Sequence, residues 1–294
     1  MPRSWSWPPA TRSLECPDVL GLRLAYKRRA RLPHTRGVES RVFLANVGAN
    51  TSHRYSSPLF DDGSFELLPI PETPPEPGPN SVTFAELRSW GDPSVSLKRF
   101  LPARLWGVAA HADPDFRQLT YGDNCERAPR AHALRQIQPG DLLMFIARLR
   151  RATGPAEAQE AGFFLIGYLE VDQVVANVAG RPAGRLPGRF EANAHVRKGR
   201  NDDRHWDGFW VFGGSKRSRR FRRAVPIDRR IAELVLRDAM GKPLAWGAGR
   251  SDLQVIGSYT RTCRCIIDPA LSGDARHRLA ILWRRIHEFN SGVT

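Results

Sequence analysis

Small polar side chains gather in the loop that follows the first apolar run of the chain. Asn50, Thr51, Ser52 and His53 come soon after Val42–Val47, a run that predicts a short buried strand. Amides and hydroxyls both donate and accept hydrogen bonds, which suits the Watson–Crick edge of a nucleobase. The same residue types also form Asx and Ser/Thr turns that satisfy their own backbone. The sequence leaves these two interpretations open.

Three further residues could contact a base or take part in acid–base chemistry. Tyr121 and Asp123 follow an Asp-Pro-Asp-Phe turn, and together they could hold a ring and a carboxylate over a base. Glu72 follows a rigid Pro-Ile-Pro, which would fix the direction of its carboxylate. A solvated linker charge explains Glu72 equally well. If the chain is an enzyme, Asp123 or Glu72 is the expected general base, with His53 or His195 as the acid.

An amide and an imidazole also lie close together later in the chain. Asn193 and His195 project from the same face if this segment is extended. A lone His is more often structural than catalytic, and no second His or carboxylate lies at a metal-ligand spacing from His195. We therefore expect neither a metal site nor a cofactor.

The strongest local charge lies between Arg197 and Arg223. This segment carries ten basic residues against three Asp, interleaved with Trp and Phe. The ten are Arg197, Lys198, Arg200, Arg204, Lys216, Arg217, Arg219, Arg220, Arg222 and Arg223. Arginines neutralise phosphates, and aromatic faces stack on unpaired bases, so we expect the segment to hold a nucleic-acid backbone. The alternative is a solvated Arg-rich loop with its aromatic side chains in the core.

Composition agrees with a polyanionic partner. The chain has 294 residues, a formal net charge of +15, 41% hydrophobic residues and 26% charged residues. These fractions are typical of a globular protein, and no apolar run reaches the roughly 18 residues that span a bilayer. Such a positive excess favours nucleic acid, with acidic membrane surfaces second. A GC-rich genome that favours Arg codons at surface positions would give the same excess of positive charge.

Cysteine usage and short motifs exclude several classes of protein. The four cysteines form no zinc pattern, and we expect free thiols in a reducing cytoplasm. The chain has no GxGxxG, GxxxxGK[ST], HExxH or GxSxG motif. Hydride transfer, P-loop phosphate binding and the common hydrolase mechanisms therefore lose support.

Strands and short helices must position these groups. Two apolar runs, Asp141–Leu149 and Phe163–Val171, predict an antiparallel pair, and helical periodicity marks residues 227–235 and 279–289. Further strands are predicted at Phe65–Leu68, Leu105–Ala110, Val211–Phe212 and Tyr259–Ile267, with a short helix at Arg130–Ile137. The mixture predicts an α+β fold with a mixed, mostly antiparallel sheet that is bent or barrel-like, and with flanking helices.

The first forty residues differ from the rest. They have Trp-Ser-Trp-Pro-Pro and a basic run, but no periodic apolar pattern and no signal-peptide core. A basic disordered arm, a transit-like segment and an upstream start codon are the alternatives, of which we favour the last. We expect residues 1–40 to be a disordered extension and residues 41–294 to form a single α+β domain.

Five short blocks resemble a known family when they are taken in order. They are Phe43–Gly48, Ser57–Gly63, Leu68–Glu72, Pro139–Phe145 and Gly167–Val171. This series resembles the third nucleotide-modification-associated domain family, over roughly residues 41–270. The resemblance implies an α+β fold in bacterial and phage proteins that accompany enzymes of DNA base modification. That family opens with an Asp-Ser pair where this chain has Asn50-Thr51.

A second, smaller likeness concerns the last two of these blocks. They look like the core strands of PUA-like barrels of the EVE and ASCH kind, which hold a flipped base in a pocket. The likeness implies that the polar loop lines such a pocket.

Three functions follow from these observations. The first is a nucleic-acid-binding protein that recognises a modified base through Asn50, Thr51, Ser52, His53, Tyr121, Asp123 and Asn193. The second is an enzyme acting on a base or nucleotide, glycosidase- or transferase-like, and the third is a non-catalytic subunit of a modification or defence complex. The expected partners are nucleic acid, DNA rather than RNA, and modification enzymes encoded nearby, with no membrane.

Overall fold

The computed structural model describes residues 40–50, 52–152, 161–243 and 263–291. The predictions for residues 1–39, for Thr51 and for the start of the Tyr259–Ile267 strand concern positions outside these ranges. The predicted N-terminal extension therefore stays a prediction.

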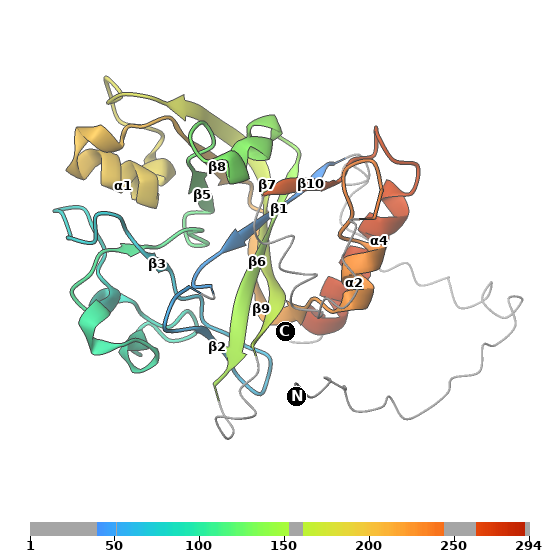
Figure 1. Ribbon diagram of the computed structural model, residues 1–294, viewed down its shortest axis with the longest axis horizontal. Helices are drawn as coiled ribbons and strands as arrows, with labels where there is room; N and C mark the ends of the chain where they lie inside the picture. The colour runs from blue at the N-terminus through green and yellow to red at the C-terminus, as the bar shows by residue number, and fades with distance from the viewer. Residues whose placement is uncertain (1–39, 51, 153–160, 244–262, 292–294) are drawn as a thin grey trace, which may run out of the picture. The chain divides into compact units, whose positions relative to one another are not determined.

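One large sheet organises the described residues (Figure 1). Its strands are β1 (Val42–Val47), β2 (Ser57–Leu59), β5 (Thr120–Asp123), β6 (Leu142–Arg151), β7 (Ala161–Val178), β8 (Phe209–Gly214), β9 (Arg219–Pro226) and β10 (Arg264–Ile267). The main path runs β10-β1-β6-β7-β8-β5, with β2 on β6 and β9 on β7. Strands β1 and β2 pair with β6 in parallel, and the other pairs are antiparallel. A separate two-stranded sheet joins β3 (Ile70–Pro71) to β4 (Ala110–His111).

Alternation along the central strands gives the sheet two apolar faces. Val42 and Leu44 of β1 belong to one buried cluster, while Phe43, Ala45 and Val47 belong to another. Strand β6 alternates in the same way. In β7 the register shifts next to Gly167, where an added Cβ would lie only 2.7 Å from the Arg219 carbonyl oxygen. This irregularity lets one long strand change which side chains face each cluster.

Helices cover the two faces unequally. The helices α2 (Arg229–Leu234) and α4 (Ala275–Asn290) pack their apolar stripes on the first cluster (Figure 1). The helix α1 (Ala194–Asn201) lies near β5 and β8. The other helices within the described ranges are short 3-10 turns: Phe84–Glu86, Leu97–Phe100, Ala103–Leu105, Pro129–Gln136, Gly188–Ala192 and Asp203–His205. In the described segments, every helix is too short or too polar to cross a bilayer.

The α+β class and the antiparallel pairing of the two apolar runs are confirmed. The barrel alternative is wrong for the described strands, because β10 and β5 end an open sheet. Two predicted strands are also corrected. Phe65–Leu68 is irregular apart from a single bridge at Phe65, and the region Leu105–Ala110 contains a 3-10 turn with only Ala110 in a strand. In the latter, Trp106 faces outward and Val108 donates back to the Leu105 carbonyl, so pairing is limited to the bridge between Ala109 and Thr83 and to Ala110 in β4.

Candidate functional site

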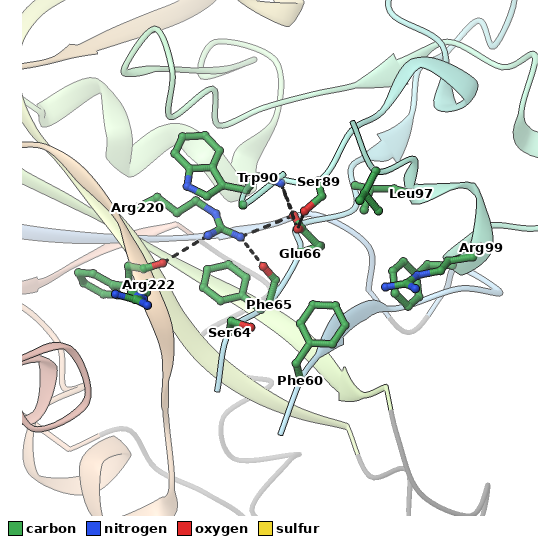
Figure 2. Close-up of a pocket in the computed structure, with 14 residues that line it drawn as sticks. Phe60, Ser64, Phe65, Glu66, Ser89, Trp90, Leu97, Arg99, Arg220 and Arg222 are labelled. Carbon is green, nitrogen blue, oxygen red and sulfur yellow. Dashed lines mark hydrogen bonds and ion pairs between the residues drawn. The ribbon is translucent and has the colours of Figure 1, made fainter. Parts of the chain in front are cut away.

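A hollow of about 560 Å³ lies where the loop after β2 meets β9 (Figure 2). Its walls come from three segments: residues 60–66, residues 89–100 and residues 220–222. The side chains that define its chemistry are Phe60, Phe65, Glu66, Ser89, Trp90, Arg99, Phe100, Arg220 and Arg222. We call this hollow the aromatic–arginine pocket. Its volume is in the range that holds a small organic ligand.

A buried ion pair forms one wall of the aromatic–arginine pocket. The Arg220 guanidinium stacks 3.9 Å from the centroid of Phe65 and 5.1 Å from that of Trp90. It donates a hydrogen bond to the Phe65 carbonyl, and its Nη2 lies 3.8 Å from a Glu66 oxygen. Burial lowers the pKa of Arg220 to about 10, so it stays charged at neutral pH. Glu66 also accepts hydrogen bonds from the Ser89 hydroxyl and the Trp90 backbone N–H.

The opposite wall and the rim are more exposed. Phe60 and Phe100 meet edge to face at 6.0 Å, and the Arg99 guanidinium covers the ring of Phe100. Arg222 is exposed, and its side chain makes no contact with an acidic group among the described residues. The rim therefore offers two arginines whose charges face solvent beside aromatic rings.

The C-terminal helix fixes the strand that carries two of these arginines. The Asn290 side chain, at the end of α4, accepts hydrogen bonds from the backbone N–H groups of Arg222 and Arg223. Its amide donates to the Arg223 carbonyl at 3.2 Å. One side chain thus closes the outer edge of β9, which would otherwise expose these groups.

A second polar cluster lies at β5, and it centres on Asp113. The Asp113 carboxylate is buried, and one oxygen accepts from the Gly122 N–H at 2.7 Å and from the Asn193 amide at 3.1 Å. The other oxygen is buried and has no hydrogen-bond partner among the described residues. Burial raises the pKa of Asp113 well above its ordinary value. Asn193 also caps α1 by accepting the backbone N–H of His195 at 3.0 Å.

Two histidines and a carboxylate complete this cluster. The rings of His111 and His195 meet edge to face at 4.7 Å, and His111 Nδ1 lies 3.9 Å from a Glu72 oxygen. Burial lowers the pKa of His195 well below its ordinary value. Potential ligand atoms of His111, Asp113 and His195 all lie within 4.8 Å of one another. The spacing argument against a metal fails here, because the fold supplies His195 with partners from a distant part of the chain.

Tyr121 and Asp123 lie close together, but both face the interior. Tyr121 packs between Phe145 and Phe212, and its hydroxyl donates to Asp123 at 2.8 Å. Asp123 is buried and pairs with Arg130 at 2.7 Å. Neither the ring nor the carboxylate is presented to an incoming base in this arrangement.

The polar loop after β1 satisfies its own backbone. The Asn50 side-chain oxygen accepts from both the N–H and the hydroxyl of Ser52, and the Asn50 N–H donates to His53 Nδ1 at 3.1 Å. No hydrogen bond or ring contact between described residues connects this loop to Tyr121 or Asp123. Of the two interpretations left open by the sequence, the local turn accounts for these contacts. His53 lines a smaller hollow of about 340 Å³ with Arg54, Arg150 and Arg151.

The ten basic residues do not form one surface. Arg197, Lys198 and Arg200 belong to α1, whereas the last four belong to β9 (Figure 1). Several are also neutralised by acidic partners, in the pairs Arg200–Glu191, Arg204–Asp202, Arg217–Glu170 and Arg220–Glu66. Only part of the predicted phosphate-binding charge is therefore free, and Arg222 at the pocket rim is a member of that part.

Sequence reasoning missed Glu66, Trp90, His111 and Asp113. Glu66 lies in a segment that the alternation of apolar residues predicted as a strand, and Trp90 lies in an irregular segment. His111 and Asp113 gave a usable signal, because residues two apart share one face of an extended chain.

Comparison with known proteins shows which family the chain matches. No curated protein and no solved structure matches the chain. One family description matches residues 41–234, which include every residue lining the aromatic–arginine pocket as well as His111, Asp113 and His195. The chain belongs to the nucleotide modification associated domain 3 family, and this membership links it to nucleotide modification.

Proposed function

We propose that the chain binds a nucleotide of a nucleic-acid strand in the aromatic–arginine pocket, and so recognises a base during base modification. The observation that carries the proposal is the pairing of aromatic walls with solvent-facing arginines at one hollow. The base would lie against Phe60, Phe100 and Trp90. One phosphate would lie at Arg222 and another phosphate of the same strand at Arg99, because these two side chains lie at opposite ends of the pocket (Figure 2).

The energetics of such a site favour a single-stranded or extruded nucleotide. Stacking of a base on an aromatic side chain contributes about 1–3 kcal/mol, whatever the base. Phosphates at the two arginines add salt-dependent contributions through counterion release. The base of a paired duplex is not accessible to such stacking, so the proposal requires an unpaired or flipped nucleotide.

The state of Glu66 favours recognition over acid–base chemistry within this pocket. Both of its oxygens lie 3.0 Å from the Trp90 N–H, and one also accepts from Ser89. Arg220 supplies the nearby positive charge. These contacts assign the Glu66 carboxylate to orienting Trp90 and facing Arg220, which is a structural role in the wall of the pocket. We therefore place binding ahead of glycosidase- or transferase-like catalysis at this pocket.

Binding to short fluorescent oligonucleotides tests the proposal. Single-stranded and duplex DNA, the matching RNA, and DNA with modified bases are titrated at two salt concentrations. Phe100→Ala is expected to weaken binding by about 5-fold to 150-fold, which corresponds to the stacking energy. Arg222→Ser is expected to lower the slope of log K against log salt by about 0.7 for a single strand.

Arg230→Ser is the matched control. Arg230 is an exposed arginine on α2, so its loss changes net charge equally without touching the pocket. If Arg230→Ser and Arg222→Ser lower the salt slope equally, or if no oligonucleotide binds at low salt, the proposal is refuted.

A further inference from the structure

The cluster of His111, Asp113 and His195 shares no lining residue with the aromatic–arginine pocket. It is assembled from β4, the segment that follows β4, and the first turn of α1. A buried carboxylate beside two imidazoles needs a reason, because burying such groups is costly unless they are paired or bind a metal.

The hydrogen bonding of Asp113 leaves one ligand position open. One oxygen is held by the Gly122 N–H and the Asn193 amide, which fixes the orientation of the carboxylate. The other oxygen is buried and has no hydrogen-bond partner in the described part of the chain. A carboxylate oriented by neighbours through one oxygen and free at the other is the arrangement that metal sites use.

The surroundings hold the three side chains together. An added Cβ at Gly122 would lie 2.6 Å from His195 Cδ2 and 3.2 Å from an Asp113 oxygen, so any larger residue would displace the imidazole or the carboxylate. Asn193 joins the two, because its oxygen caps α1 at His195 while its amide binds Asp113. Glu72 lies 3.9 Å from His111 Nδ1, where a second carboxylate could orient that ring.

We propose that His111, Asp113 and His195 bind one divalent first-row transition-metal ion. Two imidazoles and one carboxylate suit Zn²⁺ and Fe²⁺, and three protein ligands leave coordination positions for water or substrate. Donor atoms of a tetrahedral site lie roughly 3.3 Å apart when metal–ligand bonds are about 2.0 Å long. The candidate ligand atoms, which lie within 4.8 Å of one another, would therefore have to move closer together when the ion binds. The His111 side chain is 19% exposed, which leaves the cluster accessible from solvent.

Metal binding by the full chain, in the absence of any nucleotide, tests this site. The protein is stripped with a chelator and titrated calorimetrically with Zn²⁺, anaerobically with Fe²⁺, and with Co²⁺ as a spectroscopic probe. We expect one ion per chain and a visible Co²⁺ spectrum. His111→Ala, His195→Ala and Asp113→Asn should each weaken binding by more than about 100-fold, since even changes to outer residues cost about 10–100-fold.

His277→Ala is the control, because His277 is exposed on α4. Circular dichroism confirms that each variant is folded, and Asp113→Asn preserves the size and one acceptor of the side chain if the alanine variants unfold. The proposal is overturned if the stripped chain binds none of the three ions, or if the ligand variants bind as tightly as His277→Ala. Failure here leaves the nucleotide proposal intact, because the two experiments use different probes and different variants.

Discussion

Replacing Arg220 by Met tests the wall of the aromatic–arginine pocket. Arg220 is buried, stacks on Phe65, donates to the Phe65 carbonyl and faces Glu66. Removing one partner of a buried ion pair costs about 3–5 kcal/mol. The 3.8 Å separation is long, and Glu66 keeps its bonds to Ser89 and Trp90, so the low end applies. We expect Arg220→Met to lower the free energy of unfolding by about 3 kcal/mol.

Urea denaturation measures this change, and a double-mutant cycle with Glu66→Gln separates the ion pair from the stacking. The double variant should lose about 1–2 kcal/mol less unfolding free energy than the two single variants lose together. The reason is that it leaves no unpaired charge buried. Arg222→Met is the control, since Arg222 is exposed and a surface change costs within about 0.5 kcal/mol. If Arg220→Met and Arg222→Met unfold at the same urea concentration, the reasoning about the buried pair is refuted.

Three other predictions concern groups outside the pocket. Arg278 is buried in α4 and donates to the Ile266 carbonyl at 2.6 Å. Arg278→Met should therefore lower the unfolding free energy, measured in urea, by about 2–3 kcal/mol. An unchanged midpoint of urea unfolding would refute this role. The bidentate hydrogen bonds of Arg200 lower the pKa of Glu191, so this pair stabilises the fold above the ordinary Glu pKa and loses that effect as pH falls through the lowered value. Wild type and Glu191→Gln should therefore differ in thermal midpoint at pH 7 and converge at low pH, and an equal difference at both would contradict the assignment. Burial raises the pKa values of Cys125 and, to about 12, Cys263, so mass spectrometry should find both thiols unalkylated at pH 8 until denaturant is added.

The parts of the fold that could be predicted are those where the pattern of apolar residues fits only one type of secondary structure. The two apolar runs that became β6 and β7 are long enough to specify a buried antiparallel pair. The stripe on α4 likewise fixed a helix, because Leu279, Leu282 and Ile286 recur at helical spacing and are buried. These elements could be predicted because the spacing of apolar residues along the sequence shows which side chains are buried.

The site was harder to predict because its contacts join residues far apart in the chain. The sequence places Asn193 and His195 on one face only if the segment is extended. Asn193 does have extended dihedral angles, but as the N-cap of α1, a role that Asn commonly fills, and His195 lies in the helix. Glu66 and Arg220 meet only because β9 lies beside β7 and the loop after β2 folds over it. The sequence around Glu66 does not predict the contact with Arg220, and neither does the sequence around Arg220.

The hydrogen bonds of Asn290 affect where the chain can be truncated without loss of the fold. The family match ends at residue 234, and α4, with Asn290 near its end, lies beyond it. A fragment trimmed to that boundary would release the outer edge of β9, together with the arginines it displays, and would uncover the apolar face on which α4 packs. We therefore expect the smallest autonomous unit to extend beyond residue 234, and a chain that ends there to aggregate.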